Sequence, residues 1–193
     1  MKKTDTRVQY TKSVLRKAML TLLEQTPIGK ITIKDLCEEA GLNRGTFYLH
    51  YNSPYDLLKE IEDQFIDDNM TFFSSYWNSQ RDFDRMAGLF ACILNNKEVC
   101  RVLMGCNGDP QFMLSLKSLA KDGVLDEWQK EFPTHDRQEL DLLFDFVFAG
   151  SMELILSWSA NDHGLSAAEF AERLERLGHY CLLAVGKFSS RND

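Results

Sequence analysis

The chain has 193 residues, 44% hydrophobic and 26% charged, a composition that suits a globular protein and excludes the disordered and fibrous classes. Its net charge of −7 is uneven, because residues 1–52 hold nine Lys or Arg and five Asp or Glu, a net charge of +4, which leaves −11 for residues 53–193. The acidic total argues against nucleic-acid binding by the whole surface, while the basic segment keeps that function open for residues 1–52.

The N-terminal half begins with two predicted helices. Helical periodicity runs along the whole chain without alternating strand patterns, so we expect an all-α fold. The first helix is expected over residues 6–26, before a Pro-Ile-Gly turn. A second begins after Thr32, where Asp35 three residues later predicts a capping box. It ends at Gly41, which can adopt a left-handed conformation.

A short third helix is expected over residues 44–51. Asn43 precedes it, and an asparagine side chain can accept a hydrogen bond from the first unpaired N–H groups of a helix. Phe47 and Tyr51 lie four residues apart and therefore share one face, which we expect to pack against the rest of the head. The opposite face is left exposed.

The remaining chain is predicted to be helical as well. A fourth helix is expected from a cap at Ser53 to about residue 78, with Pro54 at its first position and Asp56 completing a capping box. Further helices are expected at residues 82–95, 96–104, 110–132, 136–160 and 167–188. The last two are long and rich in aromatic and small residues, which favours close packing within the chain or between subunits.

The second and third helices, joined by a tight turn that contains glycine, are typical of a helix-turn-helix, whose second helix enters the major groove of DNA. Arg44 can fork onto a guanine or bind a phosphate, Thr46 can donate to a phosphate or touch a thymine methyl group, and Gly45 allows close backbone approach. Tyr48 and His50 can reach phosphate oxygens from the same side.

The stretch I-T-I-K-D-L-C-E-E-A-G-L-N-R-G-T-F-Y-L-H-Y-N-S-P-Y-D-L, residues 31–57, resembles the N-terminal signature of the tetracycline-repressor (TetR) family of bacterial transcription regulators. The resemblance implies a three-helix DNA-binding head held together by Leu36, Ala40, Leu42, Phe47 and Tyr51. The residues expected to bind DNA are Thr32, Lys34, Asn43, Arg44, Gly45, Thr46, Tyr48 and His50.

The chain departs from the family pattern at Pro54, where many members have a lysine that contacts a backbone phosphate. That contact is lost. Backbone N–H groups at the start of the fourth helix can still face a phosphate, or basic residues elsewhere compensate for the missing lysine. Those basic residues are Lys2, Lys3, Arg7, Lys30 and Lys34.

The segment F-V-F-A-G-S-M-E-L-I-L-S-W, residues 146–158, resembles the C-terminal body of a TetR subgroup less specifically. The resemblance implies that the last two helices form the four-helix bundle of a homodimer and that the preceding helices enclose a ligand cavity. The chain also has more large aromatic residues than a compact bundle of this size needs. We expect a ligand site among Phe73, Trp77, Phe90, Phe112, Trp128 and Phe148, with core packing as the alternative for each.

These patterns predict a helix-turn-helix DNA-binding domain over residues 1–52 and a helical regulatory and dimerisation domain over residues 53–193. The expected function is repression of transcription by a homodimer that binds a palindromic operator and is released by a small-molecule effector in the C-terminal body. The alternative function is a helical co-regulator that acts through a protein partner, with weak or no DNA binding. A partner protein, or oxidation of Cys92 or Cys106, could also replace the small molecule as the signal.

Other chemistry is not indicated by the sequence. It contains no G-x-S-x-G, HExxH, phosphate loop or dinucleotide fingerprint, so we expect no enzymatic activity, cofactor or metal. The five cysteines are scattered and none forms a C-x-x-C pair, which predicts reduced and mostly buried thiols. The acidic run Glu62, Asp63, Asp67 and Asp68 predicts a solvated helix face, with attraction of a cationic ligand as the alternative. The lack of an apolar N-terminal run predicts a cytoplasmic protein without a membrane anchor.

Overall fold

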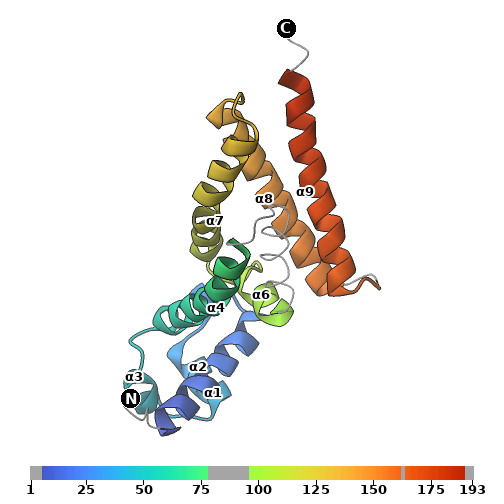
Figure 1. The fold of residues 1–193 in the computed structure, drawn as a ribbon. Helices are drawn as coiled ribbons and strands as arrows, with labels where there is room; N and C mark the ends of the chain where they lie inside the picture. The colour runs from blue at the N-terminus through green and yellow to red at the C-terminus, as the bar shows by residue number, and fades with distance from the viewer. Residues whose placement is uncertain (1–5, 78–95, 162–163, 190–193) are drawn as a thin grey trace. The chain divides into compact units, whose positions relative to one another are not determined.

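The computed structural model describes residues 6–77, 96–161 and 164–189, and within these ranges every regular element is helical. Figure 1 shows α1 (Thr6–Leu23), the 3₁₀ helix η1 (Ile28–Lys30), α2 (Ile33–Ala40), α3 (Arg44–Tyr48), α4 (Pro54–Trp77), α6 (Lys97–Leu103), α7 (Pro110–Glu131), α8 (Arg137–Ala160) and α9 (Ala167–Ser189). The prediction of an all-α fold is confirmed. No described helix combines the length and apolar character needed to cross a membrane.

Most predicted helix boundaries agree with the structure to within a few residues. The first helix ends at Leu23 rather than residue 26, because Glu24 and Gln25 donate their N–H groups to carbonyls three residues back and so tighten the last turn. The third is an α-helix only from Arg44 to Tyr48. The helix expected at residues 82–95 lies outside the described residues.

The chain divides into two compact units. The first comprises residues 1–69 together with residues 102–112, and the second comprises residues 70–101 together with residues 113–193. The compact unit that contains the helix-turn-helix therefore also includes the beginning of α4 and a segment from the middle of the chain. The predicted functional division after residue 52 stays a prediction.

The core of the first unit follows from the apolar stripe of α1. Leu15 and Met19 on α1, Leu36 on α2 and Phe47 on α3 are all completely buried. Burying a side chain of this size contributes about 1.5–3 kcal/mol relative to leaving it in water. Packing of α1 on α2 and of α2 on α3 thus fixes the three helices around one small core.

The start of α2 is fixed by the predicted capping box. The Thr32 N–H donates to the carboxylate of Asp35 over 2.9 Å, and the Asp35 N–H donates to the Thr32 hydroxyl over 3.2 Å. These hydrogen bonds lower the pKa of Asp35, so the carboxylate is ionised at neutral pH and complements the positive end of the helix. Gly41 closes the helix at a φ of 66°, the left-handed conformation expected of it.

The start of α3 depends on the side chain of Asn43. Its Oδ1 accepts a hydrogen bond from the Thr46 N–H over 2.8 Å and another from the Thr46 hydroxyl over 3.2 Å. Gly45 lies against the same oxygen, because a Cβ at this position would be 3.2 Å from Asn43 Oδ1. The cap therefore uses the three residues Asn43, Gly45 and Thr46 together.

Residues 102–112 join the head through one backbone bond and a ring contact. The Ile28 N–H in η1 donates to the Asn107 carbonyl over 3.0 Å. Further along, the rings of Phe65 on α4 and Phe112 on α7 meet edge to face with centroids 5.9 Å apart. The segment that links α6 to α7 is thus part of the first unit, although Ile28 and Asn107 are 79 positions apart in the chain.

Glu62 on α4 is buried without a hydrogen-bond partner for its Oε1, and only 4% of the residue is exposed. Burial raises the pKa of Glu62 to about 7, the negative charge of Asp109 adds to the rise, and Lys59 opposes it. The expectation of a solvated acidic face on α4 is therefore wrong for Glu62. It holds for the exposed Asp63, Asp67 and Asp68.

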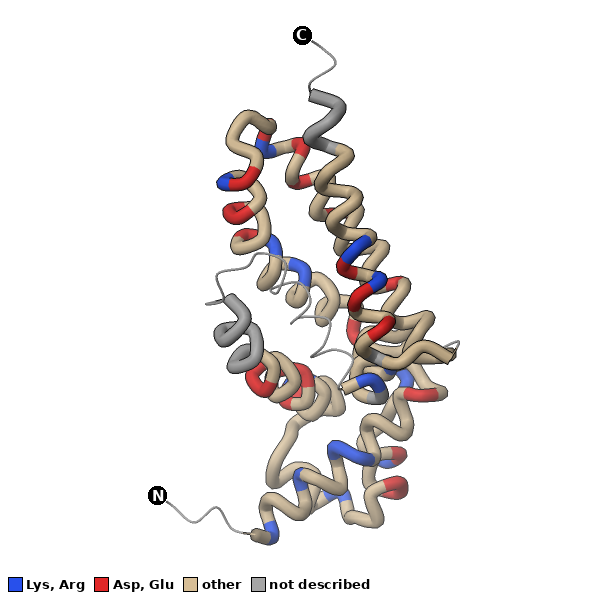
Figure 2. The backbone as a smooth tube through the Cα atoms, turned by 45° about the vertical axis from the view of Figure 1, so that its right-hand side comes forward, with Lys and Arg blue, Asp and Glu red and all other residues tan. Residues whose placement is uncertain are grey.

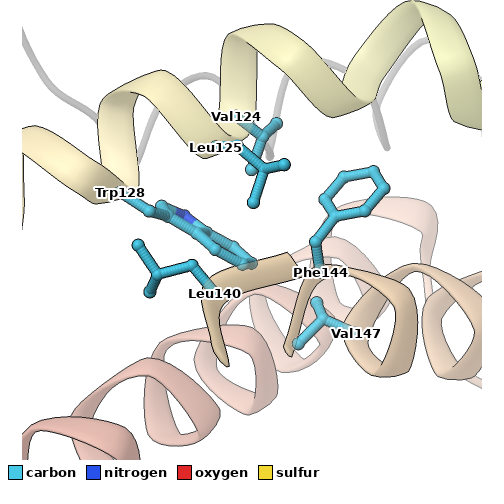
Figure 3. Close-up of a cluster of buried hydrophobic side chains, with 6 residues drawn as sticks. All are labelled: Val124, Leu125, Trp128, Leu140, Phe144 and Val147. Carbon is cyan, nitrogen blue, oxygen red and sulfur yellow. The ribbon is translucent and has the colours of Figure 1, made fainter. Parts of the chain in front are cut away.

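The second unit has its own core between α7 and α8, drawn in Figure 3. It consists of Val124, Leu125, Trp128, Leu140, Phe144 and Val147. Cys181 and Leu182 of α9 pack against this cluster. Ion pairs of Lys121 with Asp141 (2.8 Å) and of Lys117 with Asp145 (2.9 Å) run alongside and fix the register of α7 on α8.

The shared use of Asn43 Oδ1 predicts that two substitutions are coupled. Asn43→Ala removes the cap and is expected to cost about 0.5–2 kcal/mol. In the parent, Gly45→Ala should gain less than the roughly 0.5–1 kcal/mol that alanine normally gains over a helical glycine, because the added Cβ crowds the cap oxygen. In the Asn43→Ala background, where the cap oxygen is absent, Gly45→Ala should raise the free energy of unfolding by the full amount of about 0.5–1 kcal/mol. Urea unfolding of the four proteins measures this, and equal effects of Gly45→Ala in both backgrounds would refute the contact.

The buried carboxyl predicts a pH-dependent stability. The unfolded chain releases the Glu62 proton before the folded chain does, so the free energy of unfolding should fall as the pH rises from about 4.5 to about 7. Glu62→Gln should match the parent near pH 4.5 and be more stable by about 1–3 kcal/mol at pH 8. Urea unfolding at both pH values tests this, with Asp67→Asn as the control on an exposed carboxyl of the same helix. An unchanged pH slope in Glu62→Gln would contradict the prediction.

Candidate nucleic-acid interface

Two side chains predicted to bind DNA, those of Arg44 and Tyr48, are exposed on α3. Arg44 is exposed at the first helical position, and Tyr48 is 57% exposed at the last. They lie four residues apart and therefore share one face of the helix. Phe47, between them, is completely buried and meets the ring of Tyr48 edge to face at 6.0 Å. Phe47 thus anchors α3 in the core, while the guanidinium of Arg44 and the phenol of Tyr48 remain available to a ligand.

Four other residues of the predicted set have structural tasks inside the chain. The hydroxyl of Thr32 belongs to the α2 capping box, and Oδ1 of Asn43 caps α3. Both polar hydrogens of Thr46 go to that oxygen, and Gly45 leaves it room. These residues position the helices, and any direct contact of the two threonine hydroxyls with DNA would have to compete with a hydrogen bond already made.

Lys34 and His50 complete the predicted set. Lys34 is exposed and lies 3.6 Å from Glu38 one turn along α2, an ion pair open to solvent on both sides and therefore weak. His50 is half-buried, with its ring centroid 6.3 Å from that of Tyr51. Its N–H donates to the Phe47 carbonyl three residues back, which is the tightened turn that ends α3 early. Lys34 therefore offers the more accessible charge.

Basic residues are concentrated on the first helix of the chain. α1 contains Arg7, Lys12, Arg16 and Lys17 and no acidic residue. α4 has the opposite character, with six acidic residues and one lysine. Figure 2 shows this contrast as blue positions along α1 and red ones along α4. A phosphate backbone would be attracted to α1 and repelled by α4.

The start of α4 is occupied by the chain's own carboxylate. Asp56 accepts hydrogen bonds from the Asn52 N–H over 2.9 Å and from the Ser53 hydroxyl over 2.8 Å, and donates its own N–H to Ser53. The Ser53 and Asn52 hydrogen bonds lower the pKa of Asp56, so a negative charge stands where a phosphate would bind. The expected compensation for Pro54 by backbone N–H groups is therefore disfavoured at this helix start.

A polar cluster that the sequence did not predict links three elements of the head. Glu60 on α4 accepts a hydrogen bond from the Tyr51 hydroxyl at 3.0 Å and forms an ion pair with Lys12 of α1 at 2.6 Å. The Lys12 ammonium also lies 5.6 Å from the centroid of the Tyr51 ring. Burial, followed by the hydrogen bond to Glu60, raises the pKa of Tyr51, which stays protonated as a donor. No local spacing signals this cluster, because its members are 9 to 48 residues apart.

Three of the residues predicted to bind a ligand have described side chains, and the predicted ligand site stays a prediction. Phe112 is buried in the first unit against Phe65, whereas Trp128 and Phe148 belong to the core of the second unit and its edge. The positions of the Phe73 and Trp77 side chains and of Phe90 lie outside the described residues. In the described ranges no group of three His, Cys, Asp or Glu could hold a metal ion. Among the described cysteines, Cys37 and Cys100 are buried, Cys181 is partly buried and Cys106 is exposed.

Comparison with protein families gives two matches. The model of "Bacterial regulatory proteins, tetR family" matches residues 15–61, which contain α2, α3 and the beginning of α4. The model of "Transcriptional regulator C-terminal region", a TetR C-terminal family, matches residues 83–180, more than half of the chain. No curated protein matches the chain at a significant level.

Solved structures with the same fold support these matches. The fatty acid degradation regulator FadR of Bacillus halodurans has a TM-score of 0.65 and 14% identity, over 92% of this chain and 96% of that one. A TetR transcriptional regulator of Streptococcus agalactiae 2603V has a TM-score of 0.59 and 22% identity, over 90% and 96%. A putative transcriptional regulator of Pseudomonas aeruginosa PAO1 has a TM-score of 0.65 and 14% identity, over 94% and 93%. At these identities the likeness concerns the fold alone.

The helix-turn-helix of α2 and α3 coincides with the first family match, and the helices from α6 onward fall largely within the second. The chain is therefore a member of the TetR family of bacterial transcriptional regulators, which are DNA-binding proteins and not enzymes.

Proposed function

We propose that this protein is a repressor that binds a palindromic operator as a homodimer and is released by an effector in its C-terminal body. The observation that carries the proposal is α3, where capping by Asn43 and burial of Phe47 hold Arg44 and Tyr48 exposed on one face. A rigid first turn with an exposed arginine suits base or phosphate contacts in a major groove.

The contacts divide into two kinds by chemistry. Arg44 can donate two hydrogen bonds to a guanine edge and would then read sequence. Tyr48 and Lys34 carry donors suited to phosphate oxygens, and His50 offers a ring nitrogen where its half-buried ring allows. Thr32, Asn43, Gly45 and Thr46 support the interface by holding the two helix starts, and any DNA contact from them is secondary.

A homodimer is proposed because α8 and α9, which pack on each other, carry large exposed apolar side chains. Leu142 is 71% exposed, Phe146 69% and Tyr180 63%. Among the described side chains of these two helices, the large exposed apolar residues are Leu142, Phe146, Leu154, Leu177, Tyr180 and Leu183. Monomers rarely expose such residues together, and a two-fold pairing of this face would build a four-helix bundle.

An effector is proposed to act through α4, which is one continuous helix from Pro54 to Trp77. It begins three residues after Tyr51 and carries the predicted ligand residues Phe73 and Trp77 near its other end. A hydrophobic or aromatic small molecule that prefers one orientation of this helix would change operator affinity, with a coupling of about 1–3 kcal/mol. Compounds that raise the melting temperature but leave operator affinity unchanged would refute this part.

The second candidate function is a co-regulator that acts through a protein partner. The Asp56 carboxylate at the start of α4 favours it, because a phosphate contact at that helix start is disfavoured. The two functions differ in salt dependence. DNA binding that weakens steeply with salt supports the repressor, and the lack of any salt-dependent binding to DNA supports the co-regulator.

Substitutions on α3 test DNA binding. Arg44→Ala should cost about 1–3 kcal/mol of operator affinity and relax sequence preference at one position. Tyr48→Phe should weaken all sequences alike, because it removes a phosphate donor. Affinity would be measured on DNA that the protein itself selects from a random-sequence pool, with Arg137→Ala in α8 as the control. Folded Arg44→Ala and Tyr48→Phe proteins that bind as tightly as the parent would refute the interface.

A charge in the apolar face of α8 tests the dimer. Phe146→Asp places one carboxylate from each protomer in the paired face, and losing a buried aromatic anchor typically costs about 2 kcal/mol or more. We expect a folded monomer by light scattering at micromolar concentration, with greatly weakened operator binding. Leu119→Asp on α7, which is also exposed, is the control and should remain dimeric. A Phe146→Asp protein that is still dimeric would show that this face is not the interface.

A further inference from the structure

Glu60 bonds to both other members of the described Lys12–Glu60–Tyr51 cluster through its two carboxylate oxygens. Its Oε1 accepts the Tyr51 hydroxyl at 3.0 Å, and its Oε2 receives the Lys12 ammonium at 2.6 Å. Lys12 lies on α1, Tyr51 follows α3 and Glu60 lies on α4. One carboxylate thus connects the helix that leaves the head to the two sides of the head.

The cluster continues into the recognition helix. The Tyr51 ring packs on the ring of Phe47, with centroids 5.7 Å apart, and the Tyr51 N–H donates to the Phe47 carbonyl over 3.0 Å. Phe47 is completely buried in the middle of α3. A rotation of α4 about its start would therefore pull on Tyr51 and through it on α3, whereas a broken link at Glu60 would let α4 turn without them.

The stability of the head does not require this ion pair. The side chains of Lys12 and Glu60 are 40% and 46% exposed, and ion pairs this open to solvent contribute about 0–1 kcal/mol. The head core of Leu15, Leu36 and Phe47 is buried independently of it. The contacts of Glu60 therefore add little to the free energy of unfolding, but they constrain how α4 is turned relative to Lys12 of α1 and to Tyr51.

We propose that Glu60 is a positioning residue that sets the angle at which α4 leaves the head, and thereby the spacing of the two heads on DNA. This inference rests on the proposed operator binding by a homodimer. In a dimer each head is held at a distance and rotation that α4 of its own protomer determines. A head tied rigidly to α4 accepts only one half-site spacing, and a loosened head accepts several.

The experiment measures spacing discrimination. The operator is the palindrome that the full-length protein selects from random-sequence DNA, and a second duplex carries one extra base pair between the half-sites. The insertion separates the half-sites by about 3.4 Å and rotates them by roughly a tenth of a turn. The quantity measured is the ratio of the affinities for the two duplexes. If the parent protein selects no palindrome from the random-sequence DNA, the proposed function itself is wrong, and so is the inference that rests on it.

Glu60→Ala removes the contacts of Glu60 with Lys12 and Tyr51. It should lower the ratio of the affinity for the selected operator to that for the lengthened duplex about threefold or more, within the roughly 2–30-fold range of residues that couple two sites. Lys12→Met and Tyr51→Phe each remove one link, should lower it less, and keep the test available if Glu60→Ala does not fold. Lys12→Arg preserves the ion pair and should restore the parental ratio. Asp63→Ala is the matched control, since it breaks an ion pair that α4 makes with its own Lys59.

Two other roles give different results. If Lys12 bound a phosphate directly, Lys12→Met would weaken both duplexes equally and reduce the salt slope by about one. If the cluster only stabilised the head, every variant would weaken both duplexes by the same factor. Either an unchanged ratio in Glu60→Ala and Tyr51→Phe, or a ratio lowered as much by Asp63→Ala, would overturn the proposal while leaving operator binding intact.

Discussion

The side-chain oxygen of Asn43 accepts both polar hydrogens of Thr46, and the start of α3 depends on that pair of bonds. α3 has only five residues, too few for backbone hydrogen bonds to recover the cost of nucleating a helix. The cap and the buried ring of Phe47 therefore hold the helix in place. Arg44 and Tyr48 can be exposed and still well positioned because their neighbours on the same helix are not free to move.

The head consequently contains two kinds of polar residue within a few positions of each other. Some use their polar atoms in hydrogen bonds within the chain, and others leave them available to a ligand. Thr32, Asn43 and Thr46 are polar and near the surface, yet their polar atoms are used within the chain. Asp56 does the same at the start of α4, where it also places a negative charge. The basic α1 would attract a phosphate backbone, and the acidic α4 would repel it.

Two carboxylates on α4 show how neighbours from distant parts of the chain decide the behaviour of a side chain. Glu60 meets Lys12 and Tyr51 and is fully used as an acceptor. Glu62, two residues later and so on a different face, is buried near Asp109 and has an oxygen without a partner. Glu60 has a hydrogen-bond donor at each oxygen, whereas burial and the negative charge of Asp109 raise the pKa of Glu62. Both contacts arise within the first compact unit.

The sequence by itself determined the helical fold, the starts of α2, α3 and α8, the left-handed Gly41 and the helix-turn-helix. These features depend on residues three or four positions apart, such as Thr32 with Asp35, so the local pattern is sufficient. Only the tertiary structure decided which surfaces meet. It joined residues 102–112 to the head, buried Glu62, and separated Phe112 from Trp128 into different units. Those outcomes depend on contacts between residues far apart in the chain, which no spacing in one sequence encodes.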